Sequence, residues 1–309
     1  MIDSREAHDR NNAAVLGAQA DALGAALPPL LVAAERLAST VALGVHGRRK
    51  SGMGETFWQF RRYAQGDARN AIDWRQSAKS QNLFVREREW EAAETVWFWH
   101  DSSSSMDFAS DRNLPTKRDR ANLLGLALAS LLVRGGERVA IFGDRESPVS
   151  GRMALKHMTR VLTAEQSHRS AIPPEIIAEK RAQVIWFSDF LSPVSAIETA
   201  LARLLGGGLS GHLVHIVDPA EQEFPYTGRT RFEWKNIQRD DIFGRAEHAR
   251  DEYRRRFEAQ SDAVRLLARR LGWTFLAHRT DSRPEMALVA LHAQIGARKS
   301  GNAMVQVAP

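Results

Sequence analysis

Asp101, Ser103 and Ser105 are the residues whose types and spacing could most readily support chemistry. They follow the apolar run 95–100, in which apolar and polar residues do not alternate. Such a run predicts a strand buried on both faces, as in the centre of a parallel sheet covered by helices. Ligand sites in open α/β sheets form at the carboxyl ends of strands. A carboxylate and two hydroxyls are hard oxygen donors, which suit Mg²⁺ or Mn²⁺ better than zinc.

A second apolar run, 183–188, also ends in a carboxylate, Asp189. If the two predicted strands are neighbours, Asp101 and Asp189 lie at the same sheet edge, which predicts a shared site. The alternative for Asp189 is that it caps the helix expected after Pro193. The alternative for residues 102–105 is an ordinary polar turn.

The pattern Asp-x-Ser-x-Ser at 101–105 resembles the metal-ion-dependent adhesion site of von Willebrand factor A domains. In that family both serines contact the metal, the Asp is held near it through water, and a later Thr and Asp complete the site. An acidic residue of a partner protein takes the open position. The resemblance implies Mg²⁺ or Mn²⁺ held by Asp101, Ser103, Ser105 and Asp189, with Ser150 at the place of the family's Thr.

A longer resemblance begins before the metal motif. Its ordered residues are Glu55, Phe60-Arg61-x-Tyr63, Gly66-Asp67-x-Arg69, Ile72-Asp73-Trp74 and Ser77-Ala78-Lys79. With the motif at 101–106, they look like the domain-of-unknown-function family 58, bacterial proteins with a von Willebrand factor A-like domain. The resemblance covers roughly residues 40–220. It implies a chaperone-like role with two kinds of partner, a MoxR-type AAA+ ATPase and other von Willebrand factor A-type proteins.

Composition excludes several classes of function. The 309 residues are 43% apolar and 26% charged, as in a globular protein. Because there is no cysteine, disulfides, thiolate catalysis and cysteine-based metal sites are excluded. The net charge of +6 permits an anionic partner without requiring one. The basic, glycine-rich loop 47–54 lacks the residue order of a nucleotide-binding loop, so a solvated loop is the simpler interpretation.

The amino-terminal part of the chain suggests no targeting segment. Charged residues precede any apolar run, which argues against a secretory signal. The most apolar window, 16–37, is interrupted by charges and by two prolines, so no membrane span is expected. We therefore expect a cytoplasmic protein.

The predicted fold class is α/β, a doubly wound, mostly parallel sheet of von Willebrand factor A (Rossmann-like) type with an N-terminal β-containing extension. We expect strands at 41–45, 83–90, 95–101, 137–142, 183–189, 212–217 and 273–278. Helices are expected at 28–40, 120–134, 153–166, 173–181, 193–205, 242–271 and 284–295. The predicted domains are a flexible or helical segment (1–40), a family-specific subdomain (41–93), the von Willebrand factor A-like domain (94–296) and a disordered tail (297–309).

The leading functional hypothesis is a non-enzymatic, metal-dependent interaction module. A metal-dependent phosphoesterase is the second, although Asp101 lacks another metal-binding carboxylate two residues later and no catalytic lysine is evident. Nucleic-acid binding by the arginine-rich segments 55–79 and 242–271 is the third. It is disfavoured because the carboxylates interleaved in 55–79 would repel phosphate, and because arginines like those of 242–271 more often form a solvated helix face.

Overall fold

The computed structural model describes residues 29–46, 57–64, 72–79, 82–88, 93–142, 147–164, 169–175, 182–233, 240–243 and 245–305. The chain divides into two compact units. The larger combines residues 1–42 with 94–309, and the smaller comprises residues 43–93. The predicted loop 47–54 lies outside the described residues, as do residues 1–28 of the predicted segment 1–40.

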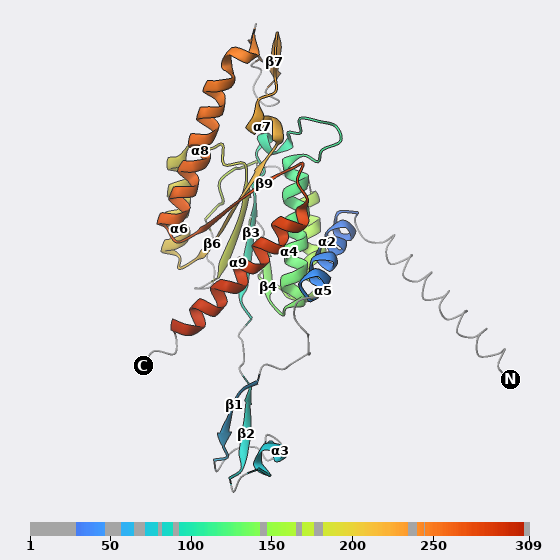
Figure 1. The fold of residues 1–309 in the computed structure, drawn as a ribbon, viewed down its shortest axis with the longest axis vertical. Helices are drawn as coiled ribbons and strands as arrows, with labels where there is room; N and C mark the ends of the chain where they lie inside the picture. The colour runs from blue at the N-terminus through green and yellow to red at the C-terminus, as the bar shows by residue number, and fades with distance from the viewer. Residues whose placement is uncertain are drawn as a thin grey trace, which may run out of the picture. The chain divides into compact units, whose positions relative to one another are not determined.

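The larger unit is built on a five-stranded, all-parallel sheet (Figure 1). Its strands are β3 (Thr95–His100), β4 (Arg138–Ile141), β5 (Gln183–Ser188), β6 (Ser210–Val217) and β9 (Thr274–Arg279), in the order β4-β3-β5-β6-β9. The predicted α/β class is thus confirmed. Val149 lies antiparallel to β4 and bridges Val139 on its outer edge.

The central strand β3 shows why a run without alternation is buried on both sides. All six of its residues are buried. Val96 and Phe98 belong to one apolar cluster, whereas Trp97 and Trp99 belong to the other. Successive side chains point to opposite faces of a sheet, so each face receives large apolar groups only if every position is apolar.

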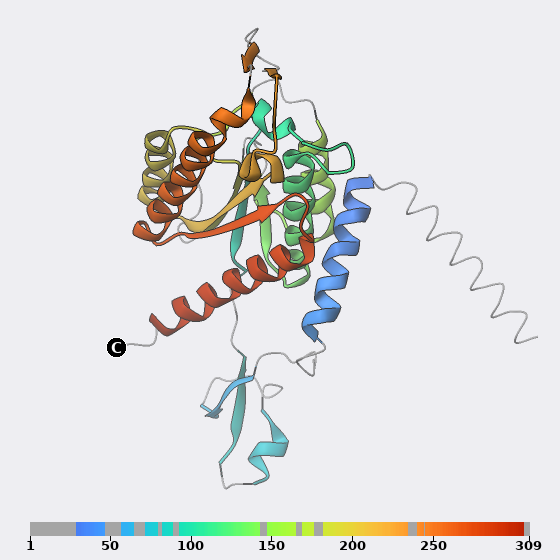
Figure 2. The same ribbon diagram turned by 45° about the horizontal axis from the view of Figure 1, so that its top comes forward.

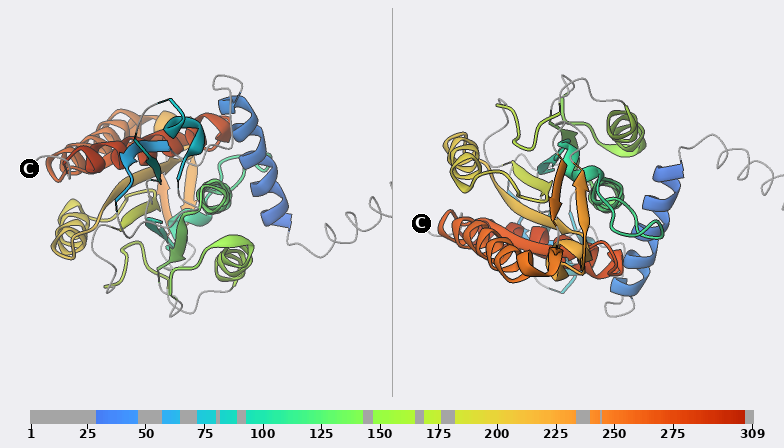
Figure 3. Two further views of the ribbon diagram at one scale, coloured as in Figure 1. Left: turned by 90° about the horizontal axis from the view of Figure 1, so that it is seen from below. Right: turned by 90° about the horizontal axis from the view of Figure 1, so that it is seen from above.

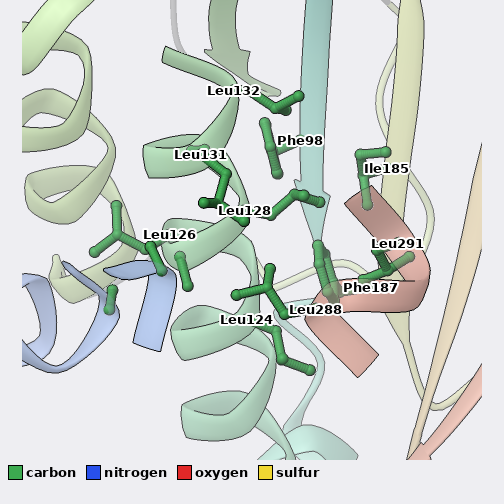
Figure 4. Close-up of a cluster of buried hydrophobic side chains, with 14 of the residues drawn as sticks. Phe98, Leu124, Leu126, Leu128, Leu131, Leu132, Ile185, Phe187, Leu288 and Leu291 are labelled. Carbon is green, nitrogen blue, oxygen red and sulfur yellow. The ribbon is translucent and has the colours of Figure 1, made fainter. Parts of the chain in front are cut away.

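Four helices contribute to the cluster on the first face. They are α2 (Pro29–His46), α4 (Lys117–Arg134), α5 (Gly151–Thr163) and α9 (Pro284–Val305). Figure 4 shows Leu128 of α4 and Leu291 of α9 in this cluster together with Phe98 of β3. The N-cap of α4 is Thr116, whose hydroxyl accepts a hydrogen bond from the Asp119 amide.

Two helices cover the second face, α6 (Val194–Gly206) and α8 (Arg250–Arg270). Their buried stripes include Ile197 and Leu201 on α6, and Val264 and Leu267 on α8. Figure 3 shows these layers from below and from above. Each fully buried aliphatic side chain contributes about 1.5–3 kcal/mol, so the two clusters are the main source of stability.

Two glycines allow close approaches within this packing. A Cβ at Gly125 of α4 would lie 2.4 Å from the His100 ring, and one at Gly211 of β6 would lie 2.0 Å from the Val184 carbonyl oxygen. Neither distance is compatible with a side chain. Gly125 therefore lets α4 approach β3, and Gly211 lets β6 pair with β5.

Between β6 and α8, the described part of the chain forms a short helix, a two-stranded hairpin and a 3₁₀ turn. Helix α7 (Pro219–Glu223) is followed by a two-stranded hairpin of β7 (Thr230–Glu233) and β8 (Asp240–Phe243), and then by a 3₁₀ turn, η3 (Ala246–Ala249). Because β8 occupies residues 240–243, the predicted helix 242–271 begins only at Arg250.

The smaller unit pairs β1 (Phe57–Arg62) with β2 (Phe84–Arg88) in an antiparallel hairpin and carries the short helix α3 (Trp74–Ser77). Asp73 caps α3 by accepting from the Gln76 amide at 2.9 Å. The β2 strand confirms the extended segment predicted at 83–90.

Three other boundaries differ from the sequence-based expectation. Residues 41–45 are helical, not a strand, because the apolar stripe of α2 continues to the buried Val41. Residues 173–175 are not helical, and the rest of that predicted helix lies outside the described residues. Helix α9 continues to Val305, well into the predicted disordered tail 297–309, through a stretch that includes the good helix formers alanine, lysine and arginine.

Within the described part of the chain, no helix is both long enough and apolar enough to cross a membrane.

Candidate functional site

The candidate site lies at the carboxyl ends of β3 and β5, which are neighbours in the sheet although 87 residues separate Asp101 from Ser188. The Asp101 amide donates to the Phe187 carbonyl at 2.9 Å, which continues the pairing of the two strands. The next strand in the chain, β4, lies on one side of β3, and the strand after that, β5, lies on the other side of β3. This is the topological switch point of a doubly wound sheet, where the strand ends form a crevice.

Asp101 is 1% exposed and fixed by two donors. Its Oδ1 accepts from the Ser103 amide at 2.8 Å, and its Oδ2 accepts from the Ser188 hydroxyl at 2.6 Å. Burial, together with the nearby charge of Asp189, raises the pKa of Asp101 to about 6 despite these hydrogen bonds. A cation at this point would stabilise the ionised form.

Ser103 and Ser105 present their hydroxyls together at the start of η2 (Ser104–Asp107), with the two Oγ atoms 3.0 Å apart. In an octahedral Mg²⁺ site with metal–oxygen bonds of 2.1 Å, neighbouring donors lie roughly 3.0 Å apart. The serine pair therefore already has the spacing of two adjacent ligands of such an ion.

Asp189 is buried and does not cap α6, whose N-cap is Pro193. Its Oδ1 accepts from the Leu191 amide at 3.2 Å, and its Oδ2 accepts from Lys117 Nζ at 2.8 Å. Burial alone would raise the pKa of Asp189. The charge and hydrogen bond of Lys117, helped by the Ser105 hydroxyl, outweigh burial and lower it.

Lys117 is a functional residue that sequence reasoning missed, since it lies before residue 120, where the helix was expected to begin. It is completely buried at the first position of α4, and its ammonium group bridges Asp189 and Glu221. Glu221 belongs to the capping box of α7 with Asp218. The signal that could have located Lys117 is the cap motif beginning at Thr116, which starts the helix earlier than expected.

Arg118 fixes the loop 101–105, which carries the two serines of the motif. This side chain donates to the carbonyls of Ser102 and Ser103 at 3.1 and 2.9 Å and pairs with Asp107 at 2.5 Å. The Ser102 hydroxyl also accepts from the Ser170 amide at 2.8 Å. The hydroxyls of the motif are therefore positioned before any ligand arrives.

Ser150 is not brought to this cluster. Val149 bridges Val139, and Val139 pairs with Val96, so Val149 lies level with the first half of β3. Asp101 comes five positions after Val96, about 16 Å further along the strand. Ser150, running antiparallel, lies further still from Asp101. Because the segment 147–150 runs antiparallel to β4, α5 begins near the amino ends of the strands, opposite the edge that carries Asp101.

With this geometry established, comparison with known proteins places the chain in a family. The family model described as "Protein of unknown function DUF58" matches residues 59–264, more than half of the chain. The chain belongs to this family. Proteins of Mycobacterium tuberculosis and Mycobacterium bovis, each called an "uncharacterized protein", are 24% identical over 221 residues, which are 67% of this chain and 68% of theirs.

Two solved structures resemble this DUF58 chain at low similarity. One is an aerotolerance-related membrane protein from Bacteroides fragilis carrying multiple mutations to serines, with 16% identity and a TM-score of 0.39. The other is the conserved hypothetical protein BatB from Bacteroides thetaiotaomicron, with 13% identity and a TM-score of 0.35. Each match covers 67% of this chain and all of the other.

The donor set of this DUF58 chain fits a small hard cation. Asp101, Ser103, Ser105 and Asp189 supply two carboxylates and two hydroxyls at one sheet edge. Among the described residues, no three His, Cys, Asp or Glu side chains converge as a metal-binding group, so any ion here would depend on the serines. Oxygen donors of this kind suit Mg²⁺ or Mn²⁺.

Proposed function

We propose that this protein is a non-enzymatic interaction module that uses a metal-ion-dependent adhesion-type site. Asp101, Ser103, Ser105 and Asp189 would hold Mg²⁺ or Mn²⁺, and a Glu or Asp of a partner protein would bind at the open coordination position. The observation that carries the proposal is the convergence of the Asp-x-Ser-x-Ser loop and Asp189 at the switch point, with the serine hydroxyls 3.0 Å apart.

The sheet supports the finer assignment to the von Willebrand factor A type. Counting the antiparallel segment at Val149 as an edge strand gives six strands in the order 3-2-1-4-5-6. This is the doubly wound order of Rossmann-like folds, and its switch point lies between the strands that end at Asp101 and Asp189.

The charges of the site favour an acidic partner. Lys117 pairs with both Asp189 and Glu221, so these three groups and Asp101 together carry a net charge of −2 when ionised, which would balance a divalent ion. A cation with two anionic ligands and hydroxyls remains electrophilic enough to accept another carboxylate, whose Coulomb attraction is strengthened by the surrounding burial. Metal binding would also lower the pKa of Asp101, since an adjacent cation favours the ionised form.

The partner class comes from the resemblance to the DUF58 family. Its proteins are typically encoded beside MoxR-type AAA+ ATPases, so we propose that the chain is an adaptor for such an ATPase in the assembly or activation of another complex. Other von Willebrand factor A-type proteins are further proposed partners, and the proposed location is the cytoplasm.

Calorimetric titration with Mg²⁺ and Mn²⁺ tests the metal site. Wild type is expected to bind one ion, Asp101→Ala to lose binding, and Ser150→Ala to bind as wild type, because Ser150 lies at the other end of β3. The proposal fails if wild type binds neither ion, or if Asp101→Ala binds as well as wild type.

A further inference from the structure

A groove lies at the outer edge of the sheet, along β9, which β6 separates from β5. Its volume is about 560 Å³, and its floor includes His215 and Ala277. One wall comes from α8 and the other from the start of α9. In Figure 2, β9 forms the sheet edge with α8 on one side and α9 on the other.

The backbone of β9 is open on this side. The Thr280 amide bonds the Val217 carbonyl of β6, so Thr280 and alternate residues before it face β6. Phe275, Ala277 and Arg279 therefore direct their amides and carbonyls to the free edge. No other strand in the described part of the chain pairs with β9, so Ala277 has an unused donor and an unused acceptor beside the groove.

The walls make the groove elongated. Phe257, Ser261 and Arg265 line it at intervals of four residues along one face of α8, a span of about 12 Å. Opposite them, Met286 of α9 is 73% exposed although it is a large apolar residue. A span of this length accommodates three or four residues of an extended chain, each about 3.3 Å long.

The charged groups that line the groove are all cationic. Arg265, Arg279 and Arg283 line it, and no Asp or Glu does. Arg265 and Arg279 pair with carboxylates outside the lining, in exposed contacts of the kind that contribute little stability. Arg283 has no ion-pair partner among the described residues. His215, 4% exposed, has a buried Nδ1 without a hydrogen-bond partner at the floor.

We propose that this groove binds an extended, acidic segment of a partner protein, which adds a strand to β9. Backbone pairing at Ala277 would supply the affinity common to strand addition. Carboxylates of the segment would pair with Arg265 and Arg283, and an apolar residue would contact Phe257 and Met286. The proposal goes beyond the metal-dependent function and requires no ion at Asp101.

Selection from a random dodecapeptide library displayed on phage, with the full chain as bait, tests this surface. We expect enrichment of proline-free peptides with acidic residues at alternate positions. Ala277→Pro removes the edge amide without touching the bonds to β6, since proline is tolerated at outward-facing positions of edge strands. It should weaken binding about tenfold, as expected for one or two lost hydrogen bonds.

Arg283→Glu reverses an exposed charge and gives an independent test that does not alter the backbone. It should weaken binding of the same peptides by at least about tenfold, whereas Ala277→Ser should bind them as wild type does. Binding should persist in EDTA, which separates this result from any failure of the metal site. The proposal is overturned if no peptide is enriched, if the enriched peptides are basic or proline-rich, or if they bind Arg283→Glu and a folded Ala277→Pro variant as well as wild type.

Discussion

At the residue scale, Lys117 determines how the site behaves without metal. Its ammonium group is completely buried and bridges Asp189 and Glu221. It supplies positive charge beside the very carboxylate that the ion would use. A bound cation would therefore share Asp189 with Lys117, and the lysine would limit how strongly the site attracts a metal ion.

Replacing Lys117→Met should destabilise the metal-free protein by roughly 3–5 kcal/mol, because two buried carboxylates lose their counter-charge. Mg²⁺ should restore part of this loss and should bind more tightly than to wild type. Urea denaturation with and without Mg²⁺ measures both effects, and Lys156→Met, at an exposed lysine of α5, is the control. An unchanged stability, or a weaker affinity for Mg²⁺, would contradict this role.

Among individual residues, the sequence predicted those whose position follows from a strand end. Asp101, Ser103, Ser105 and Asp189 each follow an apolar run, and neighbouring parallel strands bring such positions together. Ser150 could not be placed, because its location depends on the antiparallel bridge between Val149 and Val139. Glu221 was missed because its contact with Lys117 spans 104 residues and depends on the packing of α7.

At the scale of elements, the pairing of β5 with β6 depends on Gly211, which has no side chain. Gly211→Ala would bring Cβ to within 2.0 Å of the Val184 carbonyl oxygen, a backbone atom that cannot rotate away. The substitution should separate β5 from β6 locally and cost about 3 kcal/mol or more.

Thermal unfolding of Gly211→Ala measures this cost. Gly206→Ala, where a Cβ would meet nothing within 4 Å, is the matched control and should change stability little. Equal unfolding temperatures for wild type and Gly211→Ala would show that β6 approaches β5 less closely than described.

Elements were predicted best where they are buried. The strand runs 95–101 and 183–189 end within one residue of β3 and β5, because a strand buried on both faces is apolar throughout. Helix ends were predicted less well. The arginine-rich stretch 242–271 has a helical pattern, but its first two residues belong to strand β8, which pairs with β7.

At the scale of the whole molecule, buried histidines make stability depend on pH. Burial lowers the pKa of His100 to about 3 and that of His215 to about 4, from 6.5. The unfolded state therefore binds more protons below pH 6.5, and stability should fall as the pH decreases from 6.5 toward 4. The slope is at most about 1.4 kcal/mol per pH unit for each histidine.

Asp101 acts in the opposite direction, because its pKa is raised to about 6 in the folded state. Its stabilising contribution to folding is fully present below pH 3.8 and is lost as the pH rises from 3.8 to 6. On lowering the pH, Asp101 therefore adds stability and partly cancels the loss caused by the histidines. Urea denaturation at several pH values in EDTA should therefore show a steeper acid loss for Asp101→Asn than for wild type. Identical slopes would mean that Asp101 titrates as an ordinary exposed carboxyl.

The central claim is that a metal ion links this chain to an acidic group of its partner. The most direct test measures binding of a MoxR-type AAA+ ATPase from the same organism, in Mg²⁺ and in excess EDTA, by wild type, Asp101→Ala and Ser150→Ala. We expect binding in Mg²⁺ that EDTA and Asp101→Ala abolish and that Ser150→Ala retains. Equal binding in Mg²⁺ and EDTA would contradict it.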